Sequence, residues 1–210
     1  MSTTSNAISK RDIANLAGIV CGIDEAGRGA LAGPLVAAAV ILSTSEKEIS
    51  RRAGFRIRDS KTLTGIQREK IYSVLMETNA LIAFETISVR SINNHGISWA
   101  NKESMRKLIK IMHADHYILD GTISVGRVLG KSDIRSIPHA DAIVPEVICA
   151  GIVAKVERDR MMLNLDAMHP EFGWNHNCGY GTAEHIRMIQ TNGSTKYHRG
   201  IFVTTALRNI

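Results

Sequence analysis

Apolar runs separated by polar and glycine-rich breaks predict three strands in the first half of the chain. The segments 18–23, 34–42 and 80–89 are short runs rich in apolar residues, a pattern typical of buried strands. The break between the first two is too short for a crossover, so we expect these strands to pair antiparallel. The first part of the fold is therefore expected to be a sheet.

Helical spacing of apolar residues follows. Thr64 and Gln67 have the spacing of a capping box ahead of a helical stretch. Apolar residues recur at helical intervals over 105–112 and again over 144–156, and a short strand at 117–119 lies between them. Strands alternating with helices in this way predict an α/β fold, with a mixed sheet flanked by helices.

Length and composition fit one packed domain. The chain has 210 residues, of which 44% are hydrophobic and 22% charged, and this composition is typical of a globular protein rather than a disordered one. No internal repeat is visible, which argues against solenoids. We expect a single domain over 1–210, with a flexible N-terminus over 1–15 and a helical, basic C-terminal part over about 181–210.

The cysteines and the apolar segments indicate where in the cell the protein is expected. Cys21, Cys149 and Cys178 are too few, and odd in number, for a disulfide framework, which favours a reducing compartment. The first twelve residues contain no apolar run typical of a secretory signal, and the longest apolar stretch, 30–42, is too short to cross a bilayer. We expect a cytoplasmic protein with no membrane partner, and we expect it to be a monomer.

Acidic residues stand at the ends of two predicted strands. Asp24 and Glu25 end the first strand, and Asp120 ends the strand at 117–119. If these strands are parallel neighbours, their carboxylates meet at one edge of the sheet, where α/β proteins bind ligands. Carboxylates so close together repel unless a cation joins them, and oxygen ligands suit Mg²⁺ or Mn²⁺. Asp141, before the long helix, is the candidate fourth ligand.

A simpler interpretation of these acids stays open. A single aspartate at a strand end is commonly a turn former or a helix cap. Spacing alone does not separate Asp59 and Asp159 from Asp120, so the sequence does not establish which acids converge.

A glycine-rich turn follows the acidic pair directly. Glycines at 27 and 29 would let main-chain amides approach a ligand, and Arg28 could bond to a phosphate; a plain connecting loop is the alternative. Gly27, Gly29 and Ala32 also fit a loose dinucleotide-binding fingerprint. That fingerprint requires a helix to follow, whereas Pro34 and the apolar run after it indicate a strand.

Basic residues are concentrated in two places. The formal net charge is +6, from 26 Lys and Arg against 20 Asp and Glu. One concentration comprises Arg51, Arg52, Arg56, Arg58 and Lys61; the other follows Glu184 and comprises Arg187, Lys196, Arg199 and Arg208. Each could be a solvated face, but beside a metal-suited acidic cluster they favour a polyanionic substrate such as nucleic acid.

Two further groups of residues allow more than one interpretation. Tyr180 lies in a glycine-rich turn and could offer its ring to a sugar or base, or could be a core tyrosine. His176, Cys178 and His185 fall close together, but their spacing matches no common zinc pattern, so we do not expect zinc.

Six motifs together resemble one known family. GIDEAGRGALAGPLVAAAVIL, RDSKTLT, ILDG, AKVERDRMM, GYGTAEH and HRGIF occur in the order and approximate spacing of ribonuclease HII, the bacterial type 2 ribonuclease H, over about 18–202. The resemblance implies an RNase H-like fold and a four-carboxylate site using Mg²⁺ or Mn²⁺. It also implies cleavage 5′ of single ribonucleotides embedded in duplex DNA, and of RNA in RNA–DNA hybrids.

The resemblance also implies roles for individual residues. The metal-binding, catalytic carboxylates would be Asp24, Glu25, Asp120 and Asp141. The turn that senses the 2′-hydroxyl through its backbone would be Gly27, Arg28 and Gly29. Tyr180 would stack on the sugar at the RNA-to-DNA junction, and Lys61 and Lys155 would contact phosphates. The related ribonuclease HIII lacks this turn motif, which favours the HII type.

The chain departs from the family pattern at a few positions. His139 and Ala140 stand where many members have Lys-Gly, and Gly151 replaces a common serine. Asn177 and Cys178 replace His-Lys, and Ala30 replaces a proline. These positions concern the phosphate contacts more than the carboxylates.

The implied mechanism is two-metal hydrolysis that leaves 3′-hydroxyl and 5′-phosphate ends. Two other functions remain open on the sequence alone. One is a non-catalytic nucleic-acid-binding module on a degenerate RNase H-like fold, and the other is a different metal-dependent nuclease of that fold, such as a resolvase.

Overall fold

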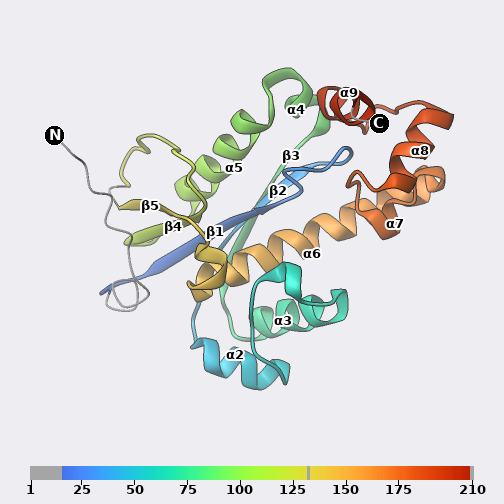
Figure 1. Cartoon of the computed structure of the whole chain (residues 1–210). Coiled ribbons are helices and arrows are strands. Elements are labelled where there is room, and N and C mark those ends of the chain that lie inside the picture. The colour runs from blue at the N-terminus through green and yellow to red at the C-terminus, as the bar shows by residue number, and fades with distance from the viewer. Residues whose placement is uncertain (1–15, 132, 209–210) are drawn as a thin grey trace.

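A five-stranded mixed sheet lies at the centre of the molecule (Figure 1). The computed structural model describes residues 16–131 and 133–208. The strands are β1 (Val20–Ala26), β2 (Leu35–Ile41), β3 (Leu81–Ile87), β4 (His116–Asp120) and β5 (Ile134–Ile137). Their order is β3-β2-β1-β4-β5, with β2 antiparallel to β1 and β3, and β4 parallel to β1 and β5. The predicted antiparallel pair and the mixed α/β fold are confirmed.

Helices cover both faces of this sheet. The helices are α2 (Glu46–Ala53), α3 (Gly65–Glu77), α4 (Val89–His95), α5 (Ile97–Ile111), α6 (Pro145–Met168), α7 (Trp174–Asn177), α8 (Ala183–Asn192) and α9 (Gly200–Arg208). The α6 helix packs on one face with α2 and α3 outside it, and α5 packs on the other. Successive residues of β2 therefore enter two different cores, Ala38 that of α6 and Ala39 that of α5.

Small residues bring α6 very close to the sheet. Every residue of β2 is buried, and three consecutive alanines occupy its centre. On β1, a Cβ at Gly22 would lie 2.2 Å from the carbonyl carbon of Glu146, so only glycine allows the start of α6 to pack on the strand there. This contact fixes the start of α6 against β1.

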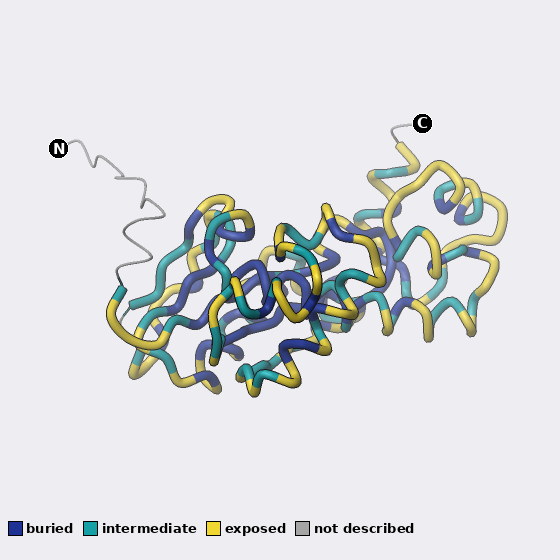
Figure 2. The backbone as a smooth tube through the Cα atoms, turned by 90° about the horizontal axis from the view of Figure 1, so that it is seen from below, coloured by how far each residue is buried: buried dark blue, intermediate teal, exposed yellow. Residues whose placement is uncertain are grey.

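The α6 helix is longer than the sheet and continues into a C-terminal helical part. Its first half is almost wholly buried, and its second half carries Met162 into a separate apolar cluster with Phe172 and Trp174. Figure 2 shows the buried backbone concentrated where the sheet and the first half of α6 lie. The predicted helical C-terminal part is confirmed, and α8 and α9 are its last helices.

Several local predictions hold and one boundary was wrong. The capping box is present, because Thr64 N–H donates to Gln67 Oε1 at 3.0 Å and Gln67 N–H to Thr64 Oγ1 at 3.2 Å. The first strand does not end before the acidic pair but continues through it to Ala26. A strand, β2, follows the glycine-rich turn, so the helix needed for a dinucleotide site is not there.

Three expectations concern the chain as a whole. The expected flexible segment over 1–15 lies outside the described residues. A single domain stays a prediction. No helix among the described residues is long and apolar enough to span a bilayer.

Candidate active site

The parallel pairing of β1 and β4 brings two of the predicted carboxylates to one edge of the sheet. The register aligns Ile23 with Leu119, so the next residues, Asp24 and Asp120, lie side by side at the carboxyl ends of neighbouring strands. Open α/β sheets bind ligands at this edge. The sequence-based expectation of parallel neighbours is confirmed.

Asp24 points towards α6. This residue is only 7% exposed, and its Oδ1 accepts a hydrogen bond from Glu25 N–H at 2.7 Å. A Cβ at Gly151 would lie 2.4 Å from Asp24 Oδ2, so the glycine in α6 makes room for this carboxylate. Burial, followed by the charges of Glu25 and Asp120, raises the pKa of Asp24 well above its ordinary value.

Glu25 points to the other side of the sheet. It lines a polar cavity of about 370 Å³ together with Arg28, Asn101 and Asp120. Burial raises the pKa of Glu25, and the nearby Arg28 guanidinium opposes that rise. The two acids of the pair point to opposite sides because regular strand geometry continues through them and alternates their directions.

Asp120 lies between these two groups, and Asp141 joins it from a short turn. Asp141 is in a single 3₁₀ turn, Ala140–Ala142, after β5. Its N–H donates to Asp120 Oδ1 at 3.3 Å, and its Oδ2 accepts from Lys61 Nζ at 3.2 Å. Burial, followed by the charge of Asp141, raises the pKa of Asp120. The turn therefore delivers the fourth carboxylate to the same edge.

The chemistry of this donor set fits a hard divalent cation. Burial first, and then the charges of neighbouring carboxylates, raise the pKa values of Asp24, Glu25 and Asp120, and a bound cation would favour their charged forms. Over residues 16–131 and 133–208, no three His, Cys, Asp or Glu side chains are grouped closely enough to hold one metal ion. The carboxylates would therefore have to turn towards one another to coordinate a shared ion.

The proposed substrate-contacting residues lie beside this edge. Arg28 and Gly29 are exposed in the turn directly after β1, whereas Gly27 is buried and has a φ of 88° that favours glycine. Tyr180 is 37% exposed, and the Lys155 Nζ lies 5.8 Å from the centre of its ring. The structure therefore pairs Lys155 with Tyr180, and Lys61 with Asp141.

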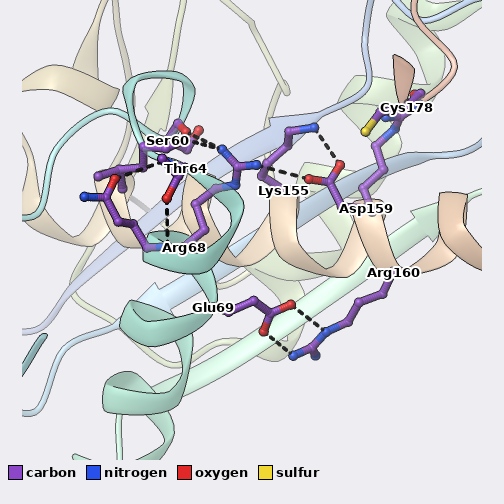
Figure 3. A network of polar contacts seen from close by, with 11 residues as sticks. Ser60, Thr64, Arg68, Glu69, Lys155, Asp159, Arg160 and Cys178 are labelled. Carbon is purple, nitrogen blue, oxygen red and sulfur yellow. Dashed lines mark hydrogen bonds and ion pairs between the residues drawn. The ribbon is translucent and has the colours of Figure 1, made fainter. Parts of the chain in front are cut away.

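A polar network connects α6 to the segment that carries Lys61 (Figure 3). Asp159 Oδ1 accepts from Lys155 Nζ at 2.6 Å, and Asp159 Oδ2 lies 3.4 Å from Arg68 Nη2. Arg68 Nη1 also donates to the carbonyls of Ser60 and Leu63, at 3.0 and 2.6 Å. Asp159 thus orients Lys155 and, through Arg68, holds the 60–63 turn.

This network separates the acids that spacing could not. Asp159 bonds to two cations on α3 and α6 and lies apart from the carboxylate edge. Asp59 caps a turn, with Oδ1 accepting from Lys61 N–H at 2.9 Å. Neither joins the four predicted metal ligands.

Part of the first basic concentration has a structural explanation. Arg51 and Arg52 both pair with Glu48 on α2, with donor–acceptor distances of 2.7 and 2.8 Å. These pairs are exposed and contribute little to stability. This section of the basic run is therefore a solvated helix face.

Of the two histidines near Cys178, His176 is exposed and His185 is buried in the C-terminal part. His185 accepts a hydrogen bond from Trp174 Nε1 at 3.0 Å on Nε2, and its Nδ1 lies 2.9 Å from the Tyr180 carbonyl oxygen. Asn177 Oδ1 accepts from Gly179 N–H at 2.7 Å. These contacts shape the turn that presents Tyr180.

Comparison with known proteins now decides the family. The family model for ribonuclease HII matches residues 21–205. The chain belongs to the ribonuclease HII family. It is 39% identical over 193 residues to a ribonuclease HII of Paramagnetospirillum magneticum, covering 91% of this chain and 93% of that protein. It is 38% identical over 189 residues to the ribonuclease HII of a Wolbachia pipientis strain, covering 89% and 91%.

Solved structures give the same fold. The Archaeoglobus fulgidus ribonuclease HII, solved in complex with PCNA, superimposes with a TM-score of 0.73 at 25% identity, covering 86% of this chain and 93% of that one. A ribonuclease H2 of Pyrococcus horikoshii gives a TM-score of 0.71 at 24% identity, covering 91% and 98%. A ribonuclease HIII solved with Mn²⁺ gives 0.68 at 18% identity, covering 91% and 70%. The predicted RNase H-like fold is confirmed.

Membership of the ribonuclease HII family establishes the class of activity. The protein is a ribonuclease H, an endonuclease among the hydrolases, and it acts on nucleic acid. A non-catalytic binding module is therefore no longer an adequate description. The HII type, favoured over HIII by the glycine-rich turn, is confirmed.

Sequence reasoning missed several residues that shape this site. Asn101 is 2% exposed beside Glu25, and its side-chain oxygen has no hydrogen-bond partner among the described residues. Arg158 and Arg199 are fully buried behind the 27–34 loop. Arg158 and Arg199 lie in the motifs AKVERDRMM and HRGIF, but neither motif shows that these side chains are buried, and no spacing marks Asn101.

Proposed function

We propose that this ribonuclease HII hydrolyses the phosphodiester on the 5′ side of ribonucleotides, both in RNA–DNA hybrids and where a single ribonucleotide is embedded in duplex DNA. The products carry 3′-hydroxyl and 5′-phosphate ends. One observation carries the proposal: four carboxylates lie at one sheet edge, directly beside the turn at 27–29, in which Arg28 and Gly29 are exposed.

The carboxylates are the proposed ligands for Mg²⁺ or Mn²⁺. Asp24, Glu25, Asp120 and Asp141 supply oxygen atoms from both sides of the sheet edge. When bound, two divalent ions supply activation of a water and stabilisation of the leaving 3′-oxygen. A ribonuclease HIII of the same fold was solved with Mn²⁺, which supports divalent metal use here. Asp120 is central because it adjoins both Glu25 and Asp141.

The turn at 27–29 is the proposed sensor of the 2′-hydroxyl. Within the described chain, the N–H groups of Arg28 and Gly29 donate to no protein acceptor, so both are available to a sugar oxygen. The 2′-hydroxyl is the group that distinguishes RNA from DNA. The ring of Tyr180, exposed beside Lys155, provides a flat surface for the sugar at the junction.

Lys61 and Lys155 are the proposed phosphate contacts. Each already bonds to a carboxylate, Lys61 to Asp141 and Lys155 to Asp159. A phosphate would exchange with or bridge to these partners, since a charge-assisted bond forms with either anion. A monomeric state and a cytoplasmic location remain predictions from the sequence.

The test is cleavage of an end-labelled DNA duplex that contains one ribonucleotide, with an all-DNA duplex alongside, in Mg²⁺ or Mn²⁺. We expect one cut, 5′ of the ribonucleotide, and none in the all-DNA duplex. Asp120→Asn should abolish the cut. Asp115→Asn is the matched control, because Asp115 accepts from Ile19 N–H at the opposite edge of the sheet.

Other outcomes would reject the proposal. Cutting at a position unrelated to the ribonucleotide, or equal cutting of the all-DNA duplex, would contradict sensing of the 2′-hydroxyl. Cleavage of four-way DNA junctions without a ribonucleotide would indicate a resolvase-type nuclease instead.

A further inference from the structure

Two arginines from distant parts of the chain bond to the main chain of the loop between β1 and β2. Arg158, on α6, donates from Nε to the Pro34 carbonyl at 3.0 Å and from Nη2 to the Ala32 carbonyl at 3.1 Å. Arg199, before α9, donates from Nε and Nη2 to the Gly33 carbonyl at 3.0 and 2.9 Å. Both residues are 0% exposed.

Each guanidinium also reaches a second segment. Arg158 Nη1 donates to the Cys178 carbonyl at 2.9 Å, and Arg199 Nη1 donates to the Arg28 carbonyl at 3.0 Å. The first bond joins the loop to the turn that presents Tyr180. The second holds the middle residue of the 27–29 turn itself.

These are unusual positions for arginine. Over residues 16–131 and 133–208, neither guanidinium forms an ion pair with a carboxylate, and a buried charge without a counter-charge is costly. Burial, followed by the charge of Arg158, lowers the pKa of Arg199 to about 9. Apolar side chains would fill this space without the cost of burying a charge, so we expect the two arginines to do more than fill the core.

The bonds fix the direction of the loop's peptide groups. With the carbonyls of Arg28, Ala32, Gly33 and Pro34 held inward, the N–H groups of Leu31 and Ala32 donate to the Gly179 carbonyl at 2.8 and 3.1 Å. A Cβ at Gly27 would lie 1.9 Å from Arg158 Nε, so the guanidinium packs directly against the glycine that opens the turn. The N–H groups of Arg28 and Gly29 take no part in this network and donate to no acceptor among the described residues.

We infer that Arg158 and Arg199 are positioning residues for ribonucleotide recognition: by holding the loop carbonyls inward, they present the free N–H groups of Arg28 and Gly29 to the 2′-hydroxyl. The inference rests on the proposed function of the 27–29 turn. It adds two buried arginines, neither of which touches the substrate, to the machinery that selects RNA.

The test uses Arg199→Lys in the full chain. Lysine keeps the charge, but its single ammonium cannot reproduce the guanidinium fork that reaches Gly33 and Arg28 together. Relative to wild type, we expect kcat/KM on the single-ribonucleotide duplex to fall at least 30-fold. Affinity for an all-DNA duplex and for Mn²⁺ should both stay within twofold.

Chemical rescue provides a second measurement. Arg199→Ala leaves a guanidinium-shaped space, so millimolar guanidinium chloride, well below denaturing concentrations, should restore at least fivefold of the lost cleavage, whereas equal sodium chloride should not. Arg160→Lys is the matched control on α6, since Arg160 pairs at the surface with Glu69 (Figure 3). It should cleave like wild type.

Each outcome distinguishes the two proposals. If wild type does not cut at the ribonucleotide, the proposed function fails. If wild type cuts there and Arg199→Lys cuts within threefold of it, the positioning role is wrong while the function stands. Equal losses in cleavage, all-DNA affinity and Mn²⁺ affinity would also overturn the positioning role, because they would show general destabilisation.

Discussion

Two regions of this molecule bury like charges, and they resolve the repulsion differently. At the carboxylate edge, Asp24, Glu25 and Asp120 lie close together with raised pKa values, and Lys61 and Arg28 offset only part of the charge. Behind the 27–34 loop, Arg158 and Arg199 also repel, but main-chain carbonyls satisfy their N–H groups. The first region needs a cation from outside, whereas the chain itself completes the second.

This difference predicts that substitutions in the two regions change the stability of the protein differently, and that added metal affects only the first region. Removing a charge from the carboxylate edge relieves repulsion and should leave the apo protein as stable as before, at the expense of activity. Removing a guanidinium leaves carbonyls without donors and should destabilise the fold whether or not metal is present. Four variants and conditions test this contrast.

Asp120→Asn should have the largest effect. We expect a loss of about a thousandfold or more in single-turnover cleavage, because Asp120 is the proposed central metal ligand. The apo melting temperature should be unchanged or slightly higher, because Asp120 no longer repels Asp141. Mg²⁺ should raise the melting temperature of wild type more than that of the variant. A clear fall in apo stability would contradict the idea of unrelieved repulsion.

Arg158→Met should have the largest effect on stability. The change leaves the carbonyls of Ala32, Pro34 and Cys178 without their donor, and the free energy of unfolding should fall by about 3 kcal/mol. Urea unfolding measures this, and added Mg²⁺ should not restore it. Arg160→Met, which removes an exposed pair with Glu69, should cost less than about 1 kcal/mol.

Acid should change the contributions of His198 and of the carboxylate edge to stability with opposite signs. His198 is buried, and burial followed by the charges of His185 and His169 lowers its pKa from 6.5 to about 4. Between these values the unfolded chain binds a proton that the folded chain does not, so this contribution is present above pH 6.5 and lost towards pH 4. It amounts to roughly 2 to 3 kcal/mol. The raised pKa values of Asp24 and Asp120 act oppositely, because the folded chain binds protons first there.

His198→Gln separates these contributions. Glutamine does not titrate, so between about pH 7 and pH 4.5 its unfolding free energy should fall less than that of wild type, by roughly 2 kcal/mol. Urea unfolding at both pH values gives the comparison. Identical pH dependence in the two proteins would show that His198 does not carry the effect.

Gly151→Ser should change stability least, but it tests most directly whether the carboxylate edge depends on metal. A side chain at this position would meet Asp24 Oδ2, so the carboxylate must move away from α6. We expect about 1 kcal/mol lower apo stability and a larger stabilisation by Mn²⁺, both measured by thermal melting. Gly65→Ser is the control, since the space at that helical glycine is open apart from Arg68; equal responses would remove the special role of position 151.

Much of this was predictable, because periodicity and motifs are local. The capping box at Thr64, the strands and the long helix follow from spacing that secondary structure imposes directly. The gathering of Asp120 with Asp24 required only the inference that two strands are parallel neighbours. Metal binding and the individual site roles stay predictions.

What could not be predicted depends on side-chain direction and long-range contact. Sequence placed Asp24 and Glu25 together, but the continued strand sends them to opposite faces. Arg158 and Arg199 resemble ordinary surface cations until tertiary contact shows main-chain carbonyls around them. Asp159 was indistinguishable from a metal ligand until Lys155 and Arg68 were seen on it.

The α6 helix also sets the distances between three parts of the site. Gly151 beside Asp24, Lys155 beside Tyr180 and Arg158 behind the loop are spaced by four and three residues along one helix face, a span of about 10 Å at 1.5 Å per residue. Insertion or deletion of one residue within that span would rotate the later positions by about 100°. Length changes in this family should therefore accumulate in loops and avoid these two turns of helix.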